Sequence, residues 1–246
     1  MISKNEVKYI RSLGQQKGRL ESGAFLVEGA KIVTEMIMQC ANQVQKIYAT
    51  APFIESVRDI SGYIDLIEVD NEMLERLSLM QAPNQALAVM KKFDFPLPPT
   101  DSKEWLMLLD GIQDPGNLGT IIRLADWFGI RNILCTLDCA DCYNPKVVQA
   151  SMGSIARIGV HAINWTDWLS NYKGPVIGTM LDGEPIQNFS FPDHGLIVIG
   201  REGSGIRTEM KSLLTQSIAI PSFGKAESLN AAVATGIVLW EMKRGS

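Results

Sequence analysis

Three segments of the 246-residue chain combine glycines with polar side chains in arrangements that could hold a ligand or serve a reaction. The first, residues 109–123, reads LDGIQDPGNLGTIIR and passes from an apolar run through glycines into a stretch with helical spacing of apolar residues. The second, residues 196–206, reads LIVIGREGSGI and is an apolar run that opens into three glycines. The third, residues 218–230, reads IAIPSFGKAESLN and ends in Ser-Leu-Asn. Because glycines let a ligand approach the backbone closely, each segment is a candidate binding loop.

The polar residues of these segments have functional and purely structural interpretations. In the first segment the apolar residues share one helix face, so Arg123 projects away from it and is free to meet a partner. In the structural alternative, Asn117 is a helix cap and Arg123 is a surface charge. Ser228 and Asn230, at the end of the third segment, are then caps of the next helix. In the second segment the glycine order G-x-x-G-x-G differs from the dinucleotide fingerprint G-x-G-x-x-G. The sequence therefore disfavours a nicotinamide dehydrogenase, while a simple turn stays open.

The cysteines bear on location and on metal chemistry. There are four of them: Cys40, Cys135, Cys139 and Cys142. They are too few and too clustered for the disulfide framework of a secreted protein, which favours a reducing, cytoplasmic location. The last three have the spacing C-x-x-x-C-x-x-C, found in radical enzymes that hold an iron–sulfur cluster on thiolates. Cys135 lies in an apolar run typical of a strand and favours an ordinary buried thiol, with the iron–sulfur enzyme as the alternative.

The second half of the chain alternates short apolar runs with helical patterns. The expected strands are residues 105–109, 132–135, 176–180, 196–199 and 217–220, and the expected helices are residues 117–128, 145–152, 165–172, 207–214 and 227–243. This alternation predicts an α/β fold with a mainly parallel sheet covered by helices on both faces. Ligands of such sheets bind beyond the carboxyl ends of the strands, which is where the three segments lie. The last helix begins apolar on nearly every side, so we expect it to pack against its own domain or a second subunit.

The first half of the chain predicts a smaller α/β module. Its expected helices are residues 4–13, 29–38 and 71–79, and its expected strands are residues 24–27, 44–49 and 86–89. Three prolines in residues 96–103 disfavour a helix and interrupt a sheet ladder. We therefore expect one domain at residues 1–95, a proline-rich linker at residues 96–103 and a second domain at residues 104–246.

Charge and hydropathy limit the possible partners. The formal net charge of −4 argues against a protein that coats nucleic acid non-specifically. The first 20 residues nevertheless contain one acidic side chain and five basic ones: Lys4, Lys8, Arg11, Lys17 and Arg19. This segment is a candidate phosphate-binding arm, with a solvated amphipathic helix as the alternative. No apolar stretch reaches the roughly 20 residues that a membrane helix needs, and charges occupy the place of a signal peptide's apolar region, so we expect neither a membrane span nor export.

Taken together, the three segments resemble the three motifs of the SpoU or TrmH family of RNA ribose methyltransferases, within the SPOUT superfamily. The matching stretches are N-x-G-x-x-x-R at residues 117–123, G-x-E-G-x-G at residues 200–205, and Ile-Pro followed by Ser-Leu-Asn at residues 220–230. Residues 141–153 resemble the family's stretch between the first two motifs. More weakly, two N-terminal stretches resemble the family's ribosomal-protein-like RNA-binding domain: residues 25–31 and 77–83.

The resemblance implies a trefoil-knotted methyltransferase domain that acts as a homodimer and binds S-adenosyl-L-methionine without a metal ion. The cofactor-binding residues that it implies are Thr179, Met180, Gly200, Gly205, Ile220 and Leu229. The catalytic residues that it implies are Asn117, Arg123, Glu202, Ser228 and Asn230. A guanidinium is effectively always protonated, so we expect Arg123 to hold a phosphate and stabilise the developing oxyanion. Glu202 is expected to position Arg123 or Asn117. Ser228 and Asn230 are expected to orient the ribose and the methionine end of the cofactor.

The function implied is methyl transfer from S-adenosylmethionine to a ribose 2′-hydroxyl of structured RNA. The N-terminal extension favours ribosomal RNA, with transfer RNA as an alternative substrate. A second alternative, a non-catalytic RNA-binding module on the same fold, is expected to have lost Arg123, Glu202 or Asn230, and all three are present. The chain departs from the family pattern at Gln149, where many relatives have arginine, and at residues 84–85, which read Asn-Gln where Gln-Gly is usual. These departures concern RNA contacts and leave the three motifs intact.

Overall fold

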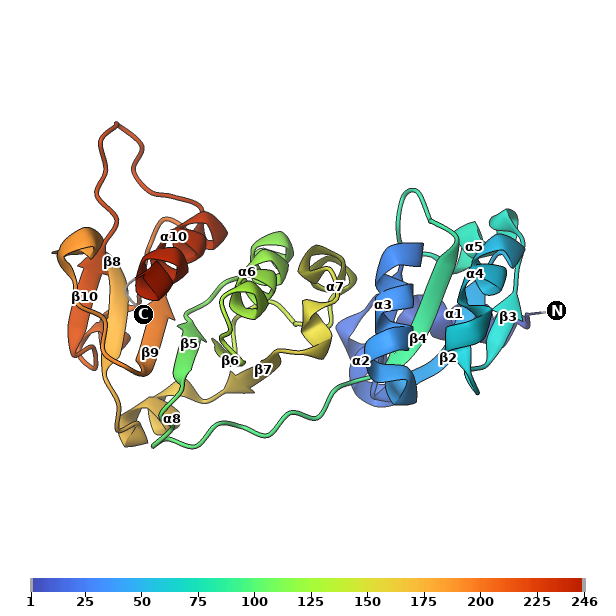
Figure 1. Cartoon of the computed structure of the whole chain (residues 1–246), viewed down its shortest axis with the longest axis horizontal. Helices are drawn as coiled ribbons and strands as arrows, with labels where there is room; N and C mark the ends of the chain where they lie inside the picture. Colours follow the sequence, from blue (N-terminus) through green and yellow to red (C-terminus); the bar gives the residue numbers. More distant parts are fainter. Residues whose placement is uncertain (1, 245–246) are drawn as a thin grey trace. The chain divides into compact units, whose positions relative to one another are not determined.

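The structure is a computed structural model that describes residues 2–244 (Figure 1). The chain forms two compact units. The N-terminal unit holds the residues up to Asp94 together with Asp141–Ala156, and the C-terminal unit holds Phe95–Ala140 together with the chain from Arg157 onward. Within the described residues, no helix is both long enough and apolar enough to cross a membrane.

The N-terminal unit is a four-stranded sheet in the order β1-β4-β2-β3 with helices packed around it. Its strands are β1 (Ala24–Glu28), β2 (Val44–Ala49), β3 (Leu66–Glu68) and β4 (Ala86–Lys91). Its helices are α1 (Lys4–Ser12), α2 (Gln16–Ser22), α3 (Ala30–Cys40), η1 (Ala41–Gln43), α4 (Ala51–Ser61), α5 (Asn71–Leu77), α7 (Pro145–Ser151) and η2 (Ser154–Ala156). Although β1 lies at the edge of the sheet, all five of its residues are buried, because α2, α3 and α7 pack against it.

Residues 141–156 pack in the N-terminal unit, although the sequence predicts a second domain that runs without interruption over residues 104–246. The ring of Tyr143 lies 4.7 Å from that of Phe25, and its hydroxyl accepts a 2.9 Å hydrogen bond from the Phe93 N–H. The guanidinium of Arg19 donates to the Asp141 carboxylate at 2.6 Å. These contacts join segments far apart in the sequence, so a single linear boundary could not include them.

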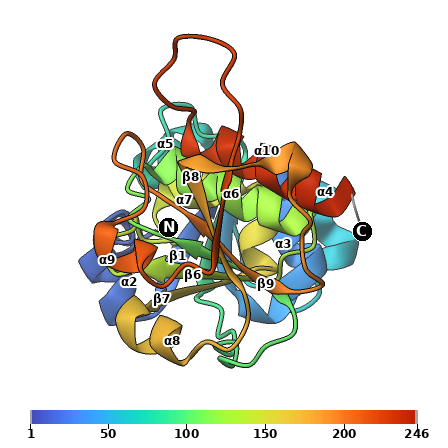
Figure 2. The same ribbon diagram turned by 90° about the vertical axis from the view of Figure 1, so that its left-hand side faces the viewer.

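The C-terminal unit contains a six-stranded sheet in the order β10-β8-β9-β5-β6-β7, with every neighbouring pair parallel. Its strands are β5 (Trp105–Leu109), β6 (Asn132–Thr136), β7 (Gly159–Ile163), β8 (Val176–Pro185), β9 (Gly195–Ile199) and β10 (Gln216–Ala219). Its helices are α6 (Pro115–Trp127), α8 (Trp165–Asn171), η3 (Ile186–Asn188), α9 (Thr208–Lys211) and α10 (Ala231–Arg244). Figure 2 shows α6 and α10 on one side of this sheet and α8 on the other. The predicted parallel sheet with two covered faces is confirmed.

Side-chain alternation along the strands explains the two covered faces. Leu106 and Leu108 of β5 join a buried cluster with Trp168 and Leu169 of α8, so one set of alternate residues faces that helix. Met107, between them, is also fully buried but lies on the opposite face. Strands that are buried on both faces read as unbroken apolar runs, which is the pattern that identified them in the sequence.

Several elements differ from the sequence predictions. β7 was not predicted, since His161 interrupts its apolar run, and α2, α4 and β3 of the N-terminal unit were also missed. The helix expected at residues 207–214 is the single turn α9, and the helix expected from residue 227 begins at Ala231. The preceding residues 222–230 are all exposed, so no packing contact extends that helix backward. The trefoil knot stays a prediction.

Candidate active site

The three motifs follow three strands of the C-terminal sheet, namely β5, β9 and β10. All strands of this sheet run in the same direction, so their carboxyl ends meet at one edge. That edge is where the side chains of the motifs gather.

The first motif is shaped by the start of α6. The Oδ1 atom of Asp114 accepts a 2.8 Å hydrogen bond from the N–H of Asn117, and Pro115 occupies the first helical position, where its missing N–H costs nothing. The cap is therefore Asp114, and the interpretation of Asn117 as the cap is wrong. With Asp114 in that role, the Asn117 amide is available for contacts outside its own helix.

One residue from each motif meets in what we name the Asn–Glu–Asn network: Asn117, Glu202 and Asn230. Asn117 Nδ2 donates to Glu202 Oε1. Asn230 Nδ2 donates to Asn117 Oδ1 at 2.9 Å and to the same Glu202 oxygen at 3.1 Å. The Oδ1 atom of Asn230 accepts from the Ala232 N–H at 3.0 Å, so Asn230 also caps α10. The capping interpretation of Asn230 is thus confirmed, and the other atom of the same amide belongs to the network.

A cavity of about 570 Å³ lies between the second and third motifs. Its lining includes all six residues expected to bind the cofactor: Thr179, Met180, Gly200, Gly205, Ile220 and Leu229. Glu202 lines it too, so the cavity and the Asn–Glu–Asn network share a carboxylate. A cavity of this volume is typical of small-molecule and cofactor sites.

Glycine is required where the cavity wall doubles back on itself. A Cβ atom on Gly200 would lie 2.4 Å from the backbone of Gly205 and Ile206, closer than packed atoms allow. Gly205 has a φ of +67°, in the left-handed region that favours glycine, and its backbone pairs with that of Arg201. The second motif is therefore a tight backbone loop whose shape depends on these two glycines.

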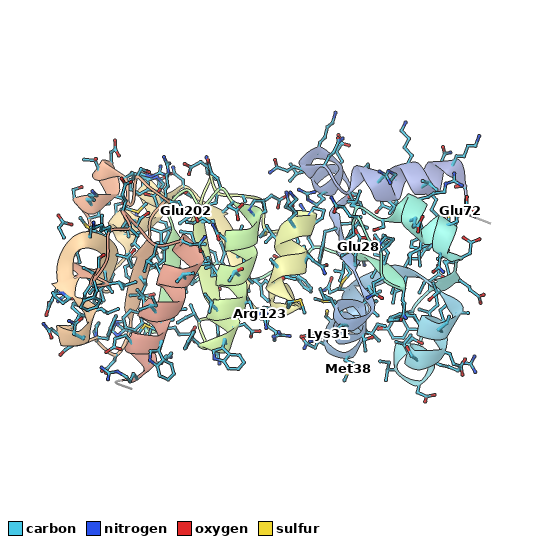
Figure 3. All side chains as sticks on the ribbon, turned by 90° about the horizontal axis from the view of Figure 1, so that it is seen from above. Glu28, Lys31, Met38, Glu72, Arg123 and Glu202 are labelled. Atoms are coloured by element: carbon cyan, nitrogen blue, oxygen red, sulfur yellow. The ribbon has the colours of Figure 1, made fainter. Side chains whose placement is uncertain are left out.

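Arg123 and Ser228 stand apart from the network. Arg123 is exposed on α6, six residues or roughly 9 Å along the helix axis from Asn117. It makes no hydrogen bond or ion pair with any residue that the structure describes, and Figure 3 shows it well separated from Glu202. Ser228 lines the cavity from the exposed third motif. A single chain thus brings Asn117, Glu202 and Asn230 together but not Arg123.

Comparison with known proteins identifies the family. The model of the SpoU rRNA Methylase family matches residues 104–240, and that of the MRM3-like substrate binding domain matches residues 4–88. The chain belongs to the SpoU rRNA methylase family. It is 28% identical to the Bacillus subtilis 23S rRNA (guanosine(2553)-2′-O)-methyltransferase RlmP, over 98% of this chain and 97% of that one.

Solved structures agree with this family. A Porphyromonas gingivalis protein assigned to the TrmH family of RNA methyltransferases superposes with a TM-score of 0.88 and 37% identity over 100% of both chains. An AdoMet-bound rRNA methyltransferase from Sinorhizobium meliloti superposes with a TM-score of 0.85 and 27% identity, over 99% of this chain and 97% of that one. The resemblance stated from the three motifs is confirmed.

Four charged residues within or next to the motif segments were not singled out from the sequence. We name them the strand-end charge cluster: Asp110, Asp138, Arg201 and Arg207. Arg207 Nε donates to Asp110 Oδ1 at 2.5 Å, and its Nη2 donates to both Asp138 oxygens at 3.1 and 3.2 Å. Arg201 Nη2 also donates to Asp138. The available signal was position, since Asp110 follows β5 directly and Asp138 follows β6 within two residues.

The five basic residues expected to bind RNA differ in setting. Lys4, Lys8 and Lys17 are exposed, with Lys17 3.8 Å from Glu21. Arg11 is exposed, and its Nη1 donates to the carbonyls of Arg76 and Ser78. The exposed side chains remain candidates for phosphate contact.

Arg19 requires a correction. Its side chain is only 2% exposed, and it donates to the Leu13 carbonyl at 2.8 Å as well as to Asp141. A guanidinium that is buried and paired in this way stabilises the N-terminal unit and cannot reach a phosphate. Sequence spacing alone did not reveal its partner, which lies 122 residues away.

The cysteines are free thiols in different settings. Cys135 is buried, in agreement with its strand position. Its side-chain hydrogen bond with Cys139 is the main reason why the pKa of Cys139 is lowered to about 6. Burial raises the pKa of Cys142 to about 12. Among residues 2–244, no group of three or more His, Cys, Asp or Glu side chains has an arrangement that could hold a metal ion.

Proposed function

We propose that this protein transfers the methyl group of S-adenosylmethionine to a ribose 2′-hydroxyl of RNA, with ribosomal RNA as the substrate class. The observation that carries the proposal is the Asn–Glu–Asn network, which shares Glu202 with a 570 Å³ cavity in a chain of the SpoU rRNA methylase family. The relative RlmP is named for 2′-O-methylation of 23S rRNA, which favours ribosomal RNA over transfer RNA.

The residues of the cavity suit a nucleoside cofactor. The backbone crossing at Gly200 leaves no room for a side chain, so a ligand there meets peptide groups. Ile220 and Leu229 supply apolar surface for an adenine ring, and Thr179 is held in place because its hydroxyl donates to the Val198 carbonyl at 3.1 Å. S-adenosylmethionine bound in this cavity would supply an electrophilic methyl group on a cationic sulfur.

The Asn–Glu–Asn network orients groups for the incoming hydroxyl. Both amides donate to Oε1 of Glu202, which leaves Oε2 without a hydrogen-bond partner among the described residues. That oxygen can accept a hydrogen bond from the ribose hydroxyl and align it for attack. As the methyl group passes from the sulfur to the ribose oxygen, the hydroxyl proton would leave to water or to an RNA phosphate and S-adenosylhomocysteine would remain. Because charge is neutralised as a developing alkoxide meets a cationic donor, a site with little water favours the step.

Arg123 is proposed to hold an RNA phosphate and to stabilise the developing oxyanion. Its guanidinium stays protonated, so it acts as a hydrogen-bond donor and a positive charge. Within one chain it does not reach the network. In a dimer, the Arg123 of one protomer can approach the Asn–Glu–Asn network of the other. The packed helices α6 and α10 both carry exposed apolar residues, on which a second protomer can dock.

A homodimer through the C-terminal unit is supported by that apolar surface. Val233, Ile237 and Trp240 are exposed along α10 at spacings of four and three residues, which place them on one helix face. Trp127, at the end of α6, is 80% exposed. Large exposed apolar side chains that form a patch are typical of a protein interface.

The N-terminal unit is proposed to bind RNA through its exposed basic residues on α1 and α2. Residues 96–103 are proposed as the linker that follows the first part of the N-terminal unit, with residues 141–156 returning to that unit. We place the protein in the cytoplasm, where its four thiols stay reduced and ribosomal RNA is available.

The test is a nucleotide-resolution map of 2′-O-methylation in the source cell with and without this gene. We expect one or a few ribosomal RNA riboses to lose their methyl group when the gene is removed. The purified protein and S-adenosylmethionine should then restore it on a transcript of that region. Loss confined to transfer RNA would favour the alternative substrate, and an unchanged map would favour a non-catalytic RNA-binding module.

A further inference from the structure

The strand-end charge cluster connects three strands to both ends of the second motif. Asp110 follows β5, Asp138 follows β6, and Arg201 follows β9, while Arg207 closes the loop that begins at Arg201. The backbone N–H of Arg207 donates to Asp110 at 2.7 Å, so the end of the loop is tied down by main chain and side chain together. The cluster therefore determines where the loop of residues 201–207 starts and ends.

The two aspartates occupy unlike settings. Asp110 is fully buried and pairs with the partly buried Arg207, so a change at Asp110 alters a charge pair inside the core. Asp138 is 38% exposed and is held in place by the Thr136 hydroxyl, which donates to it at 2.6 Å. Burial acts to raise the pKa of Asp138, but the hydrogen bonds from Thr136 and Arg207 outweigh it and hold that pKa below its ordinary value. Asp138 can thus be altered with less risk to the fold than Asp110.

Asp138 reaches the cavity through Arg201. Arg201 lies between Gly200 and Glu202, and all three residues line the cavity. Its guanidinium packs so closely on the backbone of Gly111 that a Cβ atom there would lie 2.3 Å from its Nε. Its two main-chain hydrogen bonds with Gly205, of 3.1 and 3.0 Å, close the loop. The side chain of Arg201 is held by Asp138, and its main chain is held by Gly205. Together these contacts fix the position of the neighbouring residues Gly200 and Glu202 in the cavity wall.

We propose that Asp138 is a positioning residue for the cofactor site: by holding Arg201 and Arg207, it keeps the loop of residues 201–207 in the shape that binds S-adenosylmethionine. This inference rests on the proposed function. Asp138 itself does not line the cavity, so its effect passes through the two arginines. Neither Asp138 nor its pairing with Arg201 belongs to the three motifs.

The experiment is calorimetric titration of the full-length protein with S-adenosylmethionine and with S-adenosylhomocysteine. In Asp138→Asn, the amide can still accept one hydrogen bond but loses its charge toward both arginines. We expect the Kd for each compound to rise about fivefold to tenfold, which corresponds to the net contribution of one ordinary hydrogen bond. The midpoint of thermal unfolding should fall only slightly, because Asp138 is partly exposed and Arg207 keeps its contact with Asp110. The Kd for RNA should stay unchanged, and a loss of cofactor affinity larger than the loss of stability separates positioning from a general loss of fold.

Two further variants sharpen the test. Glu104→Gln is the matched control, because it removes an exposed carboxylate paired with Arg131 at 3.3 Å in the same unit, and its cofactor Kd should equal that of the unaltered protein. Arg201→Gln breaks the Asp138 contact from the other side and should raise the Kd to a similar extent. The double variant, Asp138→Asn with Arg201→Gln, should then be little worse than either single one, since residues that act through one contact are not additive.

Several outcomes would overturn the inference. One is an unchanged cofactor Kd in both single variants, and another is a double variant whose loss equals the product of the two single losses. A fall in the unfolding midpoint that accounts for the change in Kd would show a structural role only. If the unaltered protein binds neither compound, the proposed function fails as well, whereas normal binding with no effect of Asp138→Asn removes this inference alone.

Discussion

Single side chains in this protein serve the fold and the site with different atoms. Asn230 caps α10 with its oxygen and donates to Glu202 with its nitrogen. Glu202 in turn lines the cavity and accepts from two amides with one oxygen. Because the two roles use separate atoms, a substitution can remove one role and keep the other.

Asn230→Asp makes that separation. Aspartate caps a helix as well as asparagine does, so we expect the free energy of unfolding to change by less than about 1 kcal/mol. The variant cannot donate to Glu202 at neutral pH, and it places a second negative charge where the 3.1 Å hydrogen bond now lies. Methyl transfer should fall by a factor of about 100, the usual size for losing one positioned group at the reacting centre.

The measurement for this prediction is the single-turnover rate at saturating RNA and cofactor, beside a denaturant unfolding curve. Asn144→Asp is the matched control, because Asn144 caps α7 by accepting from the Lys146 N–H at 2.9 Å and has no part in the network. Its rate should match that of the unaltered protein. A normal rate in Asn230→Asp would contradict the role that we give to the network.

At the scale of elements, the site depends on tight joins at the ends of strands. The loop after β9 folds back so closely that Gly200 has no space for a Cβ atom. In the N-terminal unit, the loop before β4 also makes a tight turn, but without glycine. Gln85 has a φ of +57° at the position where the family pattern has glycine. The departure noted at residues 84–85 therefore keeps a left-handed turn with a residue that is less suited to it.

Gly200→Ala tests the first of these joins. The added methyl group would lie 2.4 Å from the Gly205 and Ile206 backbone, so the loop must open and the cavity wall must move. We expect the Kd for S-adenosylmethionine, measured by calorimetry, to rise at least tenfold. A tenfold rise corresponds to a loss of about 1.4 kcal/mol of binding free energy. Gly236→Ala is the control, because a Cβ atom there makes ordinary 3.6 Å contacts with Leu124 and alanine favours a helix. Unaltered affinity in Gly200→Ala would show that the loop shape does not determine binding.

At the scale of the whole molecule, the position of Arg123 raises the question of how many chains form one site. Arg123 is exposed on α6 and makes no contact with the Asn–Glu–Asn network of its own chain. The apolar stripe on α10 provides a surface on which a second copy can dock. If each site combines the network of one protomer with Arg123 of the other, the protein is active as a dimer and inactive as separate chains.

Mixed dimers test this arrangement. Arg123→Ala alone and Asn230→Asp alone should each lose methyl transfer by a factor of about 100. When the two variants are co-expressed, half of the dimers are mixed and each of these has one intact site of two, so about one quarter of normal activity should return. No recovery, in preparations shown to be dimeric by sedimentation, would place Arg123 and the network in the same protomer. Cofactor affinity should stay normal in Arg123→Ala, because Arg123 does not line the cavity.

The sequence by itself determined the parts of this protein that local patterns encode. Unbroken apolar runs predicted the strands of a parallel sheet, since a strand buried on both faces has no polar alternation. The glycines and polar residues after those strands predicted the motifs, and topology then brings loops that follow parallel strands to one edge. These inferences depend on neighbouring residues and on a general rule of sheet geometry, so they needed no coordinates.

Only the tertiary structure decided which distant residues meet. The neighbouring residues of Arg19 predict an exposed arginine. In the structure its side chain is buried and pairs with Asp141, which lies 122 residues further along the chain. The same holds for residues 141–156 as a whole and for the pairing of Asp138 with Arg201. A buried charge such as that of Arg19 needs a partner, and which residue supplies that partner depends on packing that no local sequence pattern records.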